Sequence, residues 1–403
     1  MAVDPKLLAR VRDHVKAQLP AYVELLEALV KIESPSHDGP AVTRVSDFVA
    51  DVVAGDGAHV RRHQEAKGGD NLIAEWPAGA PHASNRHVMV LAHNDTVWPL
   101  GETAKRPFAV ADGRITGPGT YDMKAGLANA IFALRSLKAL GIPLTRPVKL
   151  VCAADEEIGS PTARALIERE AEGCDAALVV EGAEPKTGNL RTARKGIGVF
   201  NLKVTGKASH AGAAPRDGIN ANEELAQQIV RIHALTDYAR GTTLSCGVVK
   251  GGIGITIIAP SAEAEIDVRI PTLAEGERIE GLLRALRPVV PGAAIRIEGV
   301  FTRPPMLRTQ GNVRLFQAAK ALGEGLGLDL GESASGGGSD GNFTSALGVP
   351  TLDGLGAVGW GAHAIDETVI LDALPDRIAL LAGLLIADLG EADGAAPQVP
   401  PTS

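Results

Sequence analysis

The apolar residues of this chain recur with a helical period in some segments and cluster into short runs in others. Residues 5–31 and 122–140 show the helical period, and we expect the second helix to have Asp122 as its N-cap and to stop at Gly141. Strands are predicted at four shorter segments, 71–76, 87–93, 147–155 and 176–182. The last two are almost continuously apolar and alternate with helices, which indicates a mostly parallel sheet covered on both faces.

Near residue 191 the apolar period changes to two. Residues 196–206 alternate strictly, and the elements that follow run in the order βαββαβ over about 110 residues. This order predicts an antiparallel α+β (ferredoxin-like) domain inserted into an α/β domain. We expect the α/β domain to comprise 1–190 and 303–390, the insert to comprise 191–302, and 391–403 to be a disordered tail.

Composition narrows the possible partners and compartment. The 403 residues carry a formal net charge of −8, which disfavours nucleic acids and anionic membranes as partners. The three cysteines, Cys152, Cys174 and Cys246, are widely spaced and argue against a disulfide framework. The N-terminus is charged rather than apolar, and no run of about 18 apolar residues occurs. We therefore expect a cytoplasmic globular protein.

Acidic residues and histidines follow the predicted strands, where an open parallel sheet binds its ligands. They are His93, Asp95, Asp122, Asp155, Glu156, Glu157, Glu181 and His363. Carboxylates gathered at one edge repel one another, and divalent cations relieve that repulsion. Histidine with carboxylate oxygen suits zinc, although cobalt and manganese accept similar ligands. The set therefore indicates a site for two divalent metal ions that activate water and polarise a carbonyl.

Each of these residues also has a purely structural explanation when it is considered alone. A histidine at a strand end is often a satisfied structural residue, and Asp122 could simply cap a helix. The "DEE" at 155–157 could be the solvated start of a helix, and Glu181 could be a structural carboxylate. The metal-site hypothesis depends on their joint arrival at one sheet edge.

Two glycine-rich strings match the G-x-G-x-x-G pattern, namely "GGGSDG" at 336–341 and "GLGAVG" at 354–359. A dinucleotide site requires the string to follow a strand and to open a helix. We expect that the first string does not follow a strand and that the second does not open a helix, which argues against a nucleotide-dependent oxidoreductase. A better use of Gly336–Gly338 is a turn whose amides approach a substrate anion.

Six motifs, in order along nearly the whole chain, resemble those of the M20 metallopeptidase family, and within it the glutamate carboxypeptidases of the carboxypeptidase G type. They are "AHNDTVWP", "GPGTYDMKAG", "DEEIGS", "VVEG", "KASHAG" and "GGGSD…GWGAHAIDE". Each string alone is weak, whereas the ordered set is specific. The resemblance implies a di-zinc peptidase domain with an inserted lid and dimerisation domain.

The resemblance also implies roles for individual residues. Asp122 would bridge the two zinc ions, with His93 and Glu181 completing one site and Glu157 and His363 the other. Glu156 would be the general base, and Asp95 would orient the His93 ring.

In the insert, the resemblance implies that His210 acts in the active site of a partner subunit and stabilises an oxyanion. Arg303 would bind the terminal carboxylate of the substrate, beside Gly337 and Gly338. Thr256 stands where the family commonly has a substrate-binding Asn, which leaves the shape of the substrate pocket open. A surface-loop histidine and a solvated strand-end arginine are the structural alternatives for His210 and Arg303.

The leading hypothesis is a homodimeric di-zinc hydrolase that cleaves a small peptide or N-acyl amino acid at an amide next to a free carboxylate, most simply a glutamate carboxypeptidase. A deacylase of the acetylornithine or succinyl-diaminopimelate type, or a dipeptidase, would use the same chemistry on another substrate. A non-catalytic metal-binding protein on the same fold is the alternative from a different class, and the presence of Glu156 argues against it.

Overall fold

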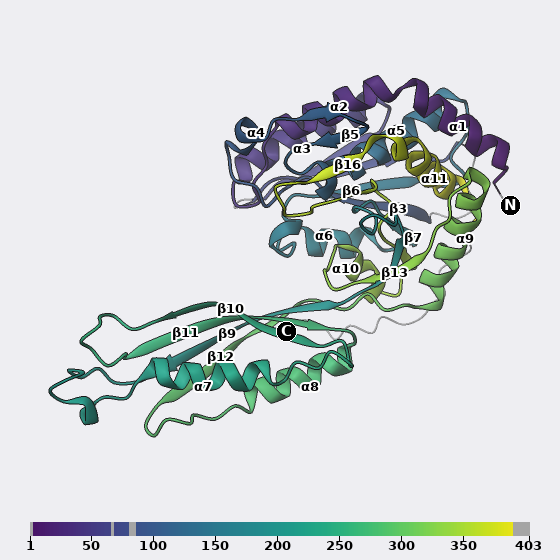
Figure 1. Ribbon diagram of the computed structural model, residues 1–403. Helices are drawn as coiled ribbons and strands as arrows, with labels where there is room; N and C mark the ends of the chain where they lie inside the picture. Colours follow the sequence, from purple (N-terminus) through teal and green to yellow (C-terminus); the bar gives the residue numbers. More distant parts are fainter. Residues whose placement is uncertain (1–2, 66–67, 80–85, 390–403) are drawn as a thin grey trace. The chain divides into compact units, whose positions relative to one another are not determined.

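The structure is a computed structural model that describes residues 3–65, 68–79 and 86–389. The chain forms two compact units (Figure 1). The first unit comprises residues 1–193, 308–334 and 339–403, and the second comprises 194–307 with 335–338. The disordered tail predicted at 391–403 lies outside the described residues.

The first unit is built on a six-stranded sheet that is mostly parallel, as predicted. Its strands lie in the order β1 (His59–His63), β2 (Asn71–Trp76), β6 (Val148–Ala153), β3 (His87–His93), β7 (Cys174–Val179) and β14 (Thr351–Leu352). The last four run parallel to one another, whereas β1 and β2 pair antiparallel. Strand β3 therefore lies between two parallel neighbours, and its carboxyl end is in the middle of the sheet edge.

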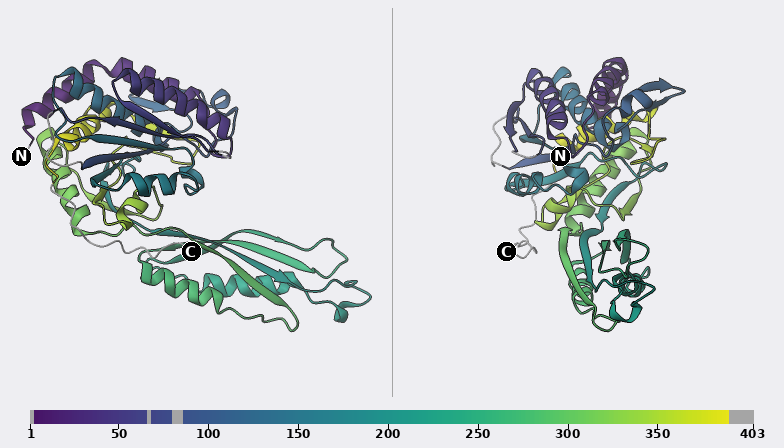
Figure 2. Two further views of the ribbon diagram at one scale, coloured as in Figure 1. Left: turned by 180° about the vertical axis from the view of Figure 1, so that it is seen from behind. Right: turned by 90° about the vertical axis from the view of Figure 1, so that its left-hand side faces the viewer.

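Helices cover both faces of this sheet because successive strand residues point to opposite sides (Figure 2). Val88 and Val90 of β3 pack in one core, whereas Met89 and Leu91 pack in another. The first core includes α1 (Pro5–Ala17), α2 (Leu19–Lys31), α3 (Gly39–Gly55), α5 (Ala125–Ala139), α9 (Gln310–Leu326) and α11 (Leu374–Ile386). The second includes α6 (Ala163–Glu170) and α10 (Gly341–Ala346).

Two helix predictions differ from the structure. The apolar period over 5–31 belongs to two helices, which meet at Gln18 because Pro20 cannot donate the backbone hydrogen bond that a continuous helix would need there. The prediction that Asp122 caps a helix is wrong, because α5 begins at Ala125 and Asp122 has a non-helical backbone (φ −118°, ψ 95°). Gly141 follows the helix with φ +66°, as expected of a helix stop.

A small four-stranded sheet joins two distant segments of the first unit. Its order is β15 (Gly359–Trp360), β16 (Thr368–Ile370), β5 (Arg114–Thr116) and β4 (Ala109–Ala111). The antiparallel pairing of β16 with β5 brings the 361–367 loop beside the turn that leads to α5. Short helix α4 (Glu102–Lys105) precedes this sheet in the chain.

The second unit has the predicted antiparallel α+β architecture. Its strands lie in the order β10 (Thr243–Gly251), β11 (Ser261–Ile270), β9 (Gly196–Thr205) and β12 (Ala294–Arg303). Helices α7 (Ala221–His233) and α8 (Leu273–Arg284) pack on the face that carries Phe200, Leu202 and Val204. Exposed apolar residues, among them Val199 and Val300, lie on the opposite face.

One expectation about the glycine strings is wrong. Strand β13 (Glu332–Ser335), which pairs with β8 (Leu190–Arg194), ends immediately before Gly336, so "GGGSDG" does follow a strand. The strand sequence is "ESAS", which has no apolar pattern that could have revealed it. The second string behaves as expected, since "GLGAVG" leads into strand β15 and not into a helix.

In the part of the chain that the structure describes, no helix combines the length and the hydropathy needed to cross a membrane.

Candidate metal centre

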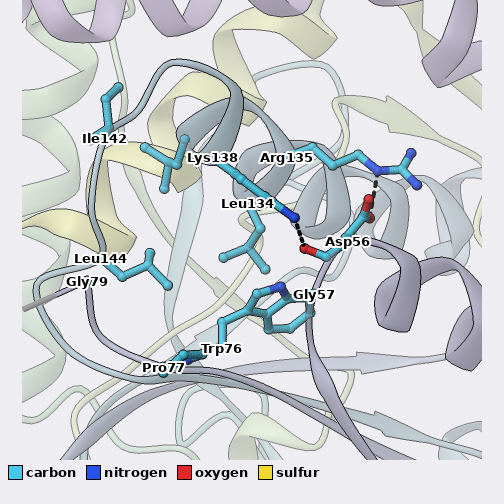
Figure 3. Close-up of a pocket in the computed structure, with 11 residues that line it drawn as sticks. Asp56, Gly57, Trp76, Pro77, Gly79, Leu134, Arg135, Lys138, Ile142 and Leu144 are labelled. Carbon is cyan, nitrogen blue, oxygen red and sulfur yellow. Dashed lines mark hydrogen bonds and ion pairs between the residues drawn. The ribbon is translucent and has the colours of Figure 1, made fainter.

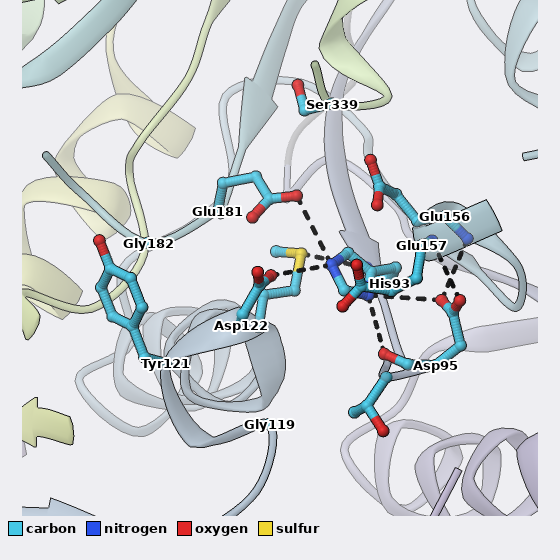
Figure 4. Close-up of polar contacts among 12 residues, drawn as sticks. His93, Asp95, Gly119, Tyr121, Asp122, Glu156, Glu157, Glu181, Gly182 and Ser339 are labelled. Carbon is cyan, nitrogen blue, oxygen red and sulfur yellow. Dashed lines mark hydrogen bonds and ion pairs between the residues drawn. The ribbon is translucent and has the colours of Figure 1, made fainter. Parts of the chain in front are cut away.

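Histidine and carboxylate side chains converge at the carboxyl edge of the main sheet in the first unit (Figure 4). His93 is the last residue of β3, and Glu181 lies two residues beyond β7. Glu156 and Glu157 form a short helical turn after β6. Asp122 lies in the Thr120–Lys124 turn before α5, and His363 lies in the loop between β15 and β16. Four separate chain segments thus deliver the first five of these residues, and a fifth segment delivers His363.

The two carboxylate oxygens of Asp122 face different histidines. Oδ1 lies 3.3 Å from Nε2 of His93, and Oδ2 lies 3.4 Å from Nε2 of His363. The same His93 nitrogen lies 3.5 Å from Glu181, and the same His363 nitrogen lies 2.9 Å from Glu157. The five side chains therefore form two groups that share Asp122, each with one imidazole and one further carboxylate.

Glu156 lies close to these groups. One ligand atom from each of His93, Glu156 and Glu181 falls within 4.8 Å of the others, and the same is true of His93, Asp122 and Glu157. These ligand atoms are thus close enough to one another to hold a cation. The Glu156 carboxylate lies within this same limit of the His93 ring, as the Glu181 carboxylate does.

Asp95 is fully buried and contacts three parts of the site. Its backbone carbonyl lies 3.0 Å from Nδ1 of His93, and its carboxylate lies 3.4 Å from the same nitrogen. The carboxylate also accepts hydrogen bonds from the backbone amides of Glu156 and Glu157, each at 3.1 Å, and from the hydroxyl of Ser36 at 2.7 Å. Asp95 therefore holds the glutamate pair as well as the imidazole. The contact with His93 was expected, whereas the hydrogen bonds to the glutamate pair and to Ser36 were not.

The two imidazoles of the cluster offset only part of the negative charge of its carboxylates. Burial and the nearby Asp122 carboxylate raise the pKa of Glu157 to about 7. Hydrogen bonds to Asp122 and Glu157 raise the pKa of His363 to about 10. Among the residues that the structure describes, buried Oε1 of Glu157 has no hydrogen-bond partner. A buried oxygen without a partner, amid carboxylates and imidazoles, fits a divalent cation bound by oxygen and nitrogen donors.

Sequence reasoning also missed Glu367, which is 1% exposed. Its carboxylate accepts hydrogen bonds from backbone amides of the turn that carries Asp122. No sequence pattern marks such partners, because every residue except proline has a backbone amide. The available signal is that Glu367, four residues after His363, is the last residue of the motif "GWGAHAIDE".

His210 and Thr256 lie on neighbouring exposed loops of the second unit. Nδ1 of His210 accepts hydrogen bonds from the backbone amides of Gly212 and Ala213, each at 3.1 Å. The backbone oxygen of Thr256 accepts one from the amide of Ala211 at 2.8 Å. Because Nδ1 is an acceptor, the neutral His210 ring carries its proton on Nε2.

Arg303, at the end of β12, is 2% exposed, so the interpretation of this residue as a solvated strand-end charge is wrong. A side chain at Gly338 would come within 2.9 Å of the Arg303 stem, which explains why a glycine stands there. The carbonyls of Gly337 and Gly338 accept hydrogen bonds from the Arg194 guanidinium at 3.2 and 3.1 Å. The amide of Gly337 donates to the Ser335 hydroxyl.

A separate pocket of about 230 Å³ lies between α3, β2 and α5 (Figure 3). Its walls are mainly apolar and include Trp76 and Leu134. The two cations that line it, Arg135 and Lys138, both donate to Asp56. The histidine and carboxylate side chains of the sheet edge are not part of its lining.

Imidazoles and carboxylates gathered at the edge of such a sheet define a metal-dependent hydrolase, and comparison with known proteins gives its family. The chain belongs to peptidase family M20/M25/M40, whose family model matches residues 89–387.

Curated relatives and solved structures agree with this membership. The chain is 32% identical over 397 residues to carboxypeptidase G2 of Pseudomonas sp. (strain RS-16), covering 95% of this chain and 94% of that protein. It is 26% identical over 293 residues to acetylornithine deacetylase of Proteus mirabilis (strain HI4320), covering 68% and 73%. The fold is similar to the crystal structure of aminopeptidase PepT from Bacillus cereus ATCC 10987, with a TM-score of 0.74, 22% identity and coverage of 91% and 98%.

Proposed function

We propose that this protein is a dinuclear zinc carboxypeptidase that cleaves an amide bond next to a free carboxylate, with C-terminal glutamate as the residue released. The observation that carries the proposal is the pair of donor groups that share Asp122. The 32% identity to carboxypeptidase G2 supports the choice of substrate. A small peptide or N-acyl amino acid, and neither a nucleic acid nor a membrane, would be the partner. The three free cysteines support a location in the cytoplasm.

The five donors of the two groups would hold the metal ions. Asp122 would bridge them, His93 and Glu181 would complete one site, and Glu157 and His363 would complete the other. When bound, two zinc ions would lower the pKa of a water molecule and polarise the scissile carbonyl. Cobalt or manganese could occupy the same donors.

Glu156 is the general base of this proposal. Its carboxylate takes the proton of the attacking water and passes it to the amine that leaves. The hydrogen bond from its amide to Asp95 fixes the start of the side chain. Because Asp95 also holds the amide of Glu157, one buried carboxylate aligns the base with a metal ligand.

The second unit would be the lid domain, which supplies contacts to the substrate and the interface of the dimer. The Nε2–H of His210 would donate to the oxyanion that forms on the substrate carbonyl in the partner subunit. Arg303, with Thr256, Gly337 and Gly338, would bind the substrate carboxylate. Support for a homodimer comes from apolar side chains beside the His210 loop that are unusually exposed, since Ile253 is 68% and Ile255 is 99% accessible.

The decisive test combines metal analysis with hydrolysis of a substrate panel. We expect two zinc ions per chain and the fastest hydrolysis for acylated glutamate or folate-like conjugates. Faster hydrolysis of N-acetylornithine or of dipeptides would replace the carboxypeptidase assignment with a deacylase or dipeptidase. Two bound metals without hydrolysis of any amide would favour a non-catalytic metal-binding protein.

A further inference from the structure

Glu367 is a buried carboxylate on which four hydrogen-bond donors converge. Oε1 accepts from the backbone amides of Tyr121 and Asp122 at 2.8 and 2.9 Å. Oε2 accepts from the amide of Gly119 at 2.8 Å and from the indole nitrogen of Trp98 at 3.2 Å. Both oxygens are therefore used twice, and three of the four donors belong to the turn that carries Asp122.

The backbone of this turn does not follow regular helical geometry. Gly119 has φ +72°, and Asp122 departs from helical geometry although helix α5 begins three residues later. The amides of such a turn have no carbonyls of a ladder or helix to bind, and a buried amide without a partner is costly. The carboxylate of Glu367 supplies the missing acceptor for three of them, so the conformation of the turn depends on a side chain almost 250 residues later in the chain.

The segment that carries Glu367 is itself tied to the site. His363 lies four residues earlier, in the same loop. Arg106 donates to the Ile365 carbonyl at 3.2 Å and lies 4.0 Å from the centre of the Trp98 ring. Trp98 in turn follows the His93–Asp95 segment. Glu367 therefore connects three of the segments that deliver donors to the metal centre.

We propose that Glu367 is a positioning residue that fixes the direction of the two Asp122 oxygens, and thereby the separation at which two metal ions are held. This role rests on the proposed function, because it concerns the residue proposed to bridge the ions. Glu367 does not contact the substrate or the metal ions in this proposal. It acts through the backbone amides of the turn.

The chemistry of the site explains why a carboxylate is needed. A glutamine at 367 has one oxygen and one NH₂ group, and the NH₂ group would face two N–H donors on one side. Whichever way the amide turned, it would lose the acceptor for either Tyr121 and Asp122 or Gly119 and Trp98. Glu367→Gln thus keeps the volume of the side chain and removes half of its acceptor capacity.

The test compares Glu367→Gln with a matched control, Glu170→Gln. Glu170 is also a buried glutamate of the first unit, but its partners are Arg61 and Lys149, near the start of β3 rather than its end. We expect Glu367→Gln to fold and to bind zinc roughly 10–100-fold more weakly, the usual effect of losing a residue that orients a ligand. The visible absorption spectrum of its cobalt-substituted form should also change. Glu170→Gln should lower thermal stability and leave zinc affinity and the cobalt spectrum unchanged.

A third measurement requires no metal. Amide hydrogen exchange at Tyr121 and Asp122 should be faster in metal-free Glu367→Gln than in the metal-free wild type, and unchanged in Glu170→Gln. If Glu367→Gln does not fold, Trp98→Phe removes one donor from Oε2 and should weaken zinc binding by a smaller factor.

Unchanged zinc affinity and cobalt spectrum in folded Glu367→Gln, or in Trp98→Phe if the first variant does not fold, would overturn the positioning role. A wild-type protein that binds no metal would instead contradict the proposed function. The exchange rates would still report whether Glu367 holds the turn, so the two failures are distinguishable.

Discussion

Glu156 and Glu157 are adjacent in the chain, their amides bind the same carboxylate, and yet we expect their replacement to have different effects. Glu156→Gln cannot accept a proton, so kcat should fall roughly 10²–10⁴-fold while two metal ions per chain remain. Glu157→Gln would remove a residue that we propose as a metal ligand, so its metal content should fall as well. Metal analysis alongside steady-state kinetics checks both. A Glu156→Gln enzyme that keeps most of its rate would place the base elsewhere.

His87 gives a pH dependence of stability that is independent of the site. It is 3% exposed, its Nε2 lies 3.0 Å from the Glu170 carbonyl, and burial together with the positive charge of Lys149 lowers its pKa to about 4. The unfolded chain, with a histidine pKa near the ordinary value of about 6.5, binds more protons between these two values. Stability should therefore be complete above about pH 6.5 and fall as the pH drops towards 4, by on the order of 2 kcal/mol.

Replacement of His87 by Gln keeps an N–H donor and removes the titrating group. Urea unfolding at a series of pH values should give a shallower decline for His87→Gln than for the wild type between about pH 6.5 and 4. Metal-free protein is used for both, so that loss of metal does not contribute. Parallel curves for the two proteins would show that His87 is not the source of the slope.

The sequence reveals the candidate metal ligands better than it reveals the residues that fix those ligands in place. His93, Glu157 and Glu181 are conspicuous because charged side chains follow strands that are otherwise apolar. Ser36 and Glu367 have no such context, since the first binds a carboxylate 59 residues away and the second binds backbone amides. Residues of this second kind become visible only when the backbone path is known.

At the scale of elements, the "GLGAVG" segment packs against the backbone that carries Glu181. The amide of Gly356 donates to the Glu181 carbonyl at 2.9 Å, and a Cβ atom at 356 would lie 2.2 Å from the Val180 oxygen. The buried guanidinium of Arg377 donates hydrogen bonds to the carbonyls of Gly354 and Gly356. These glycines therefore allow close approach of two backbones, which is a use of the motif unrelated to nucleotides.

Gly356→Ala should consequently destabilise the protein by about 1–3 kcal/mol, because the added methyl group has no space. Zinc affinity should fall too, since the displaced backbone carries Glu181. Gly55→Ala, in helix α3, is the matched control, because its Cβ would meet nothing within 4 Å. That change should be neutral or stabilising by up to about 1 kcal/mol. Denaturant titration and zinc competition provide the measurements, and equal effects of the two changes would contradict the packing argument.

Element type was easier to predict than element boundaries. Strands β2, β3, β6, β7 and β9 lie where the apolar patterns predict strands, with ends that differ by up to three residues. The start of α5 was misplaced because the sequence signal for an N-cap is the same aspartate that instead faces two histidines. Strand β13 was missed because its residues are small and polar. In both cases tertiary contacts, which no local pattern records, decide the local structure.

For the whole molecule, chelation should abolish hydrolysis and lower the melting temperature of the protein, and added zinc should restore both. The reason is that the donors are brought together by folding, so metal binding stabilises the folded state. Calorimetry with and without a chelator, followed by zinc addition, measures the effect. Full activity in protein shown to contain no metal would contradict the dinuclear mechanism.

The proposed homodimer gives a complementation test. His210→Ala and Glu156→Gln each leave every site defective, but a mixed dimer has one site with both groups intact if His210 acts across the interface. Mixing the two inactive proteins should therefore recover activity, up to about one working site in each mixed dimer. Subunit exchange without recovered activity would show that His210 serves its own subunit or has no catalytic role.

The distance in sequence between the Asp122 turn and its partners also bears on how the protein is made. Asp122 faces His363, and the turn around it is held by Glu367, so the two halves of the site are separated in the chain by the whole second unit and by helix α9. A ribosome completes the His93, Glu157 and Glu181 segments long before it reaches residue 363. During that interval the nascent chain lacks the histidine of one donor group and the acceptor that shapes the turn. The donor set proposed for the second metal ion is therefore complete only late in synthesis, and we expect a chain that ends before residue 363 to be inactive.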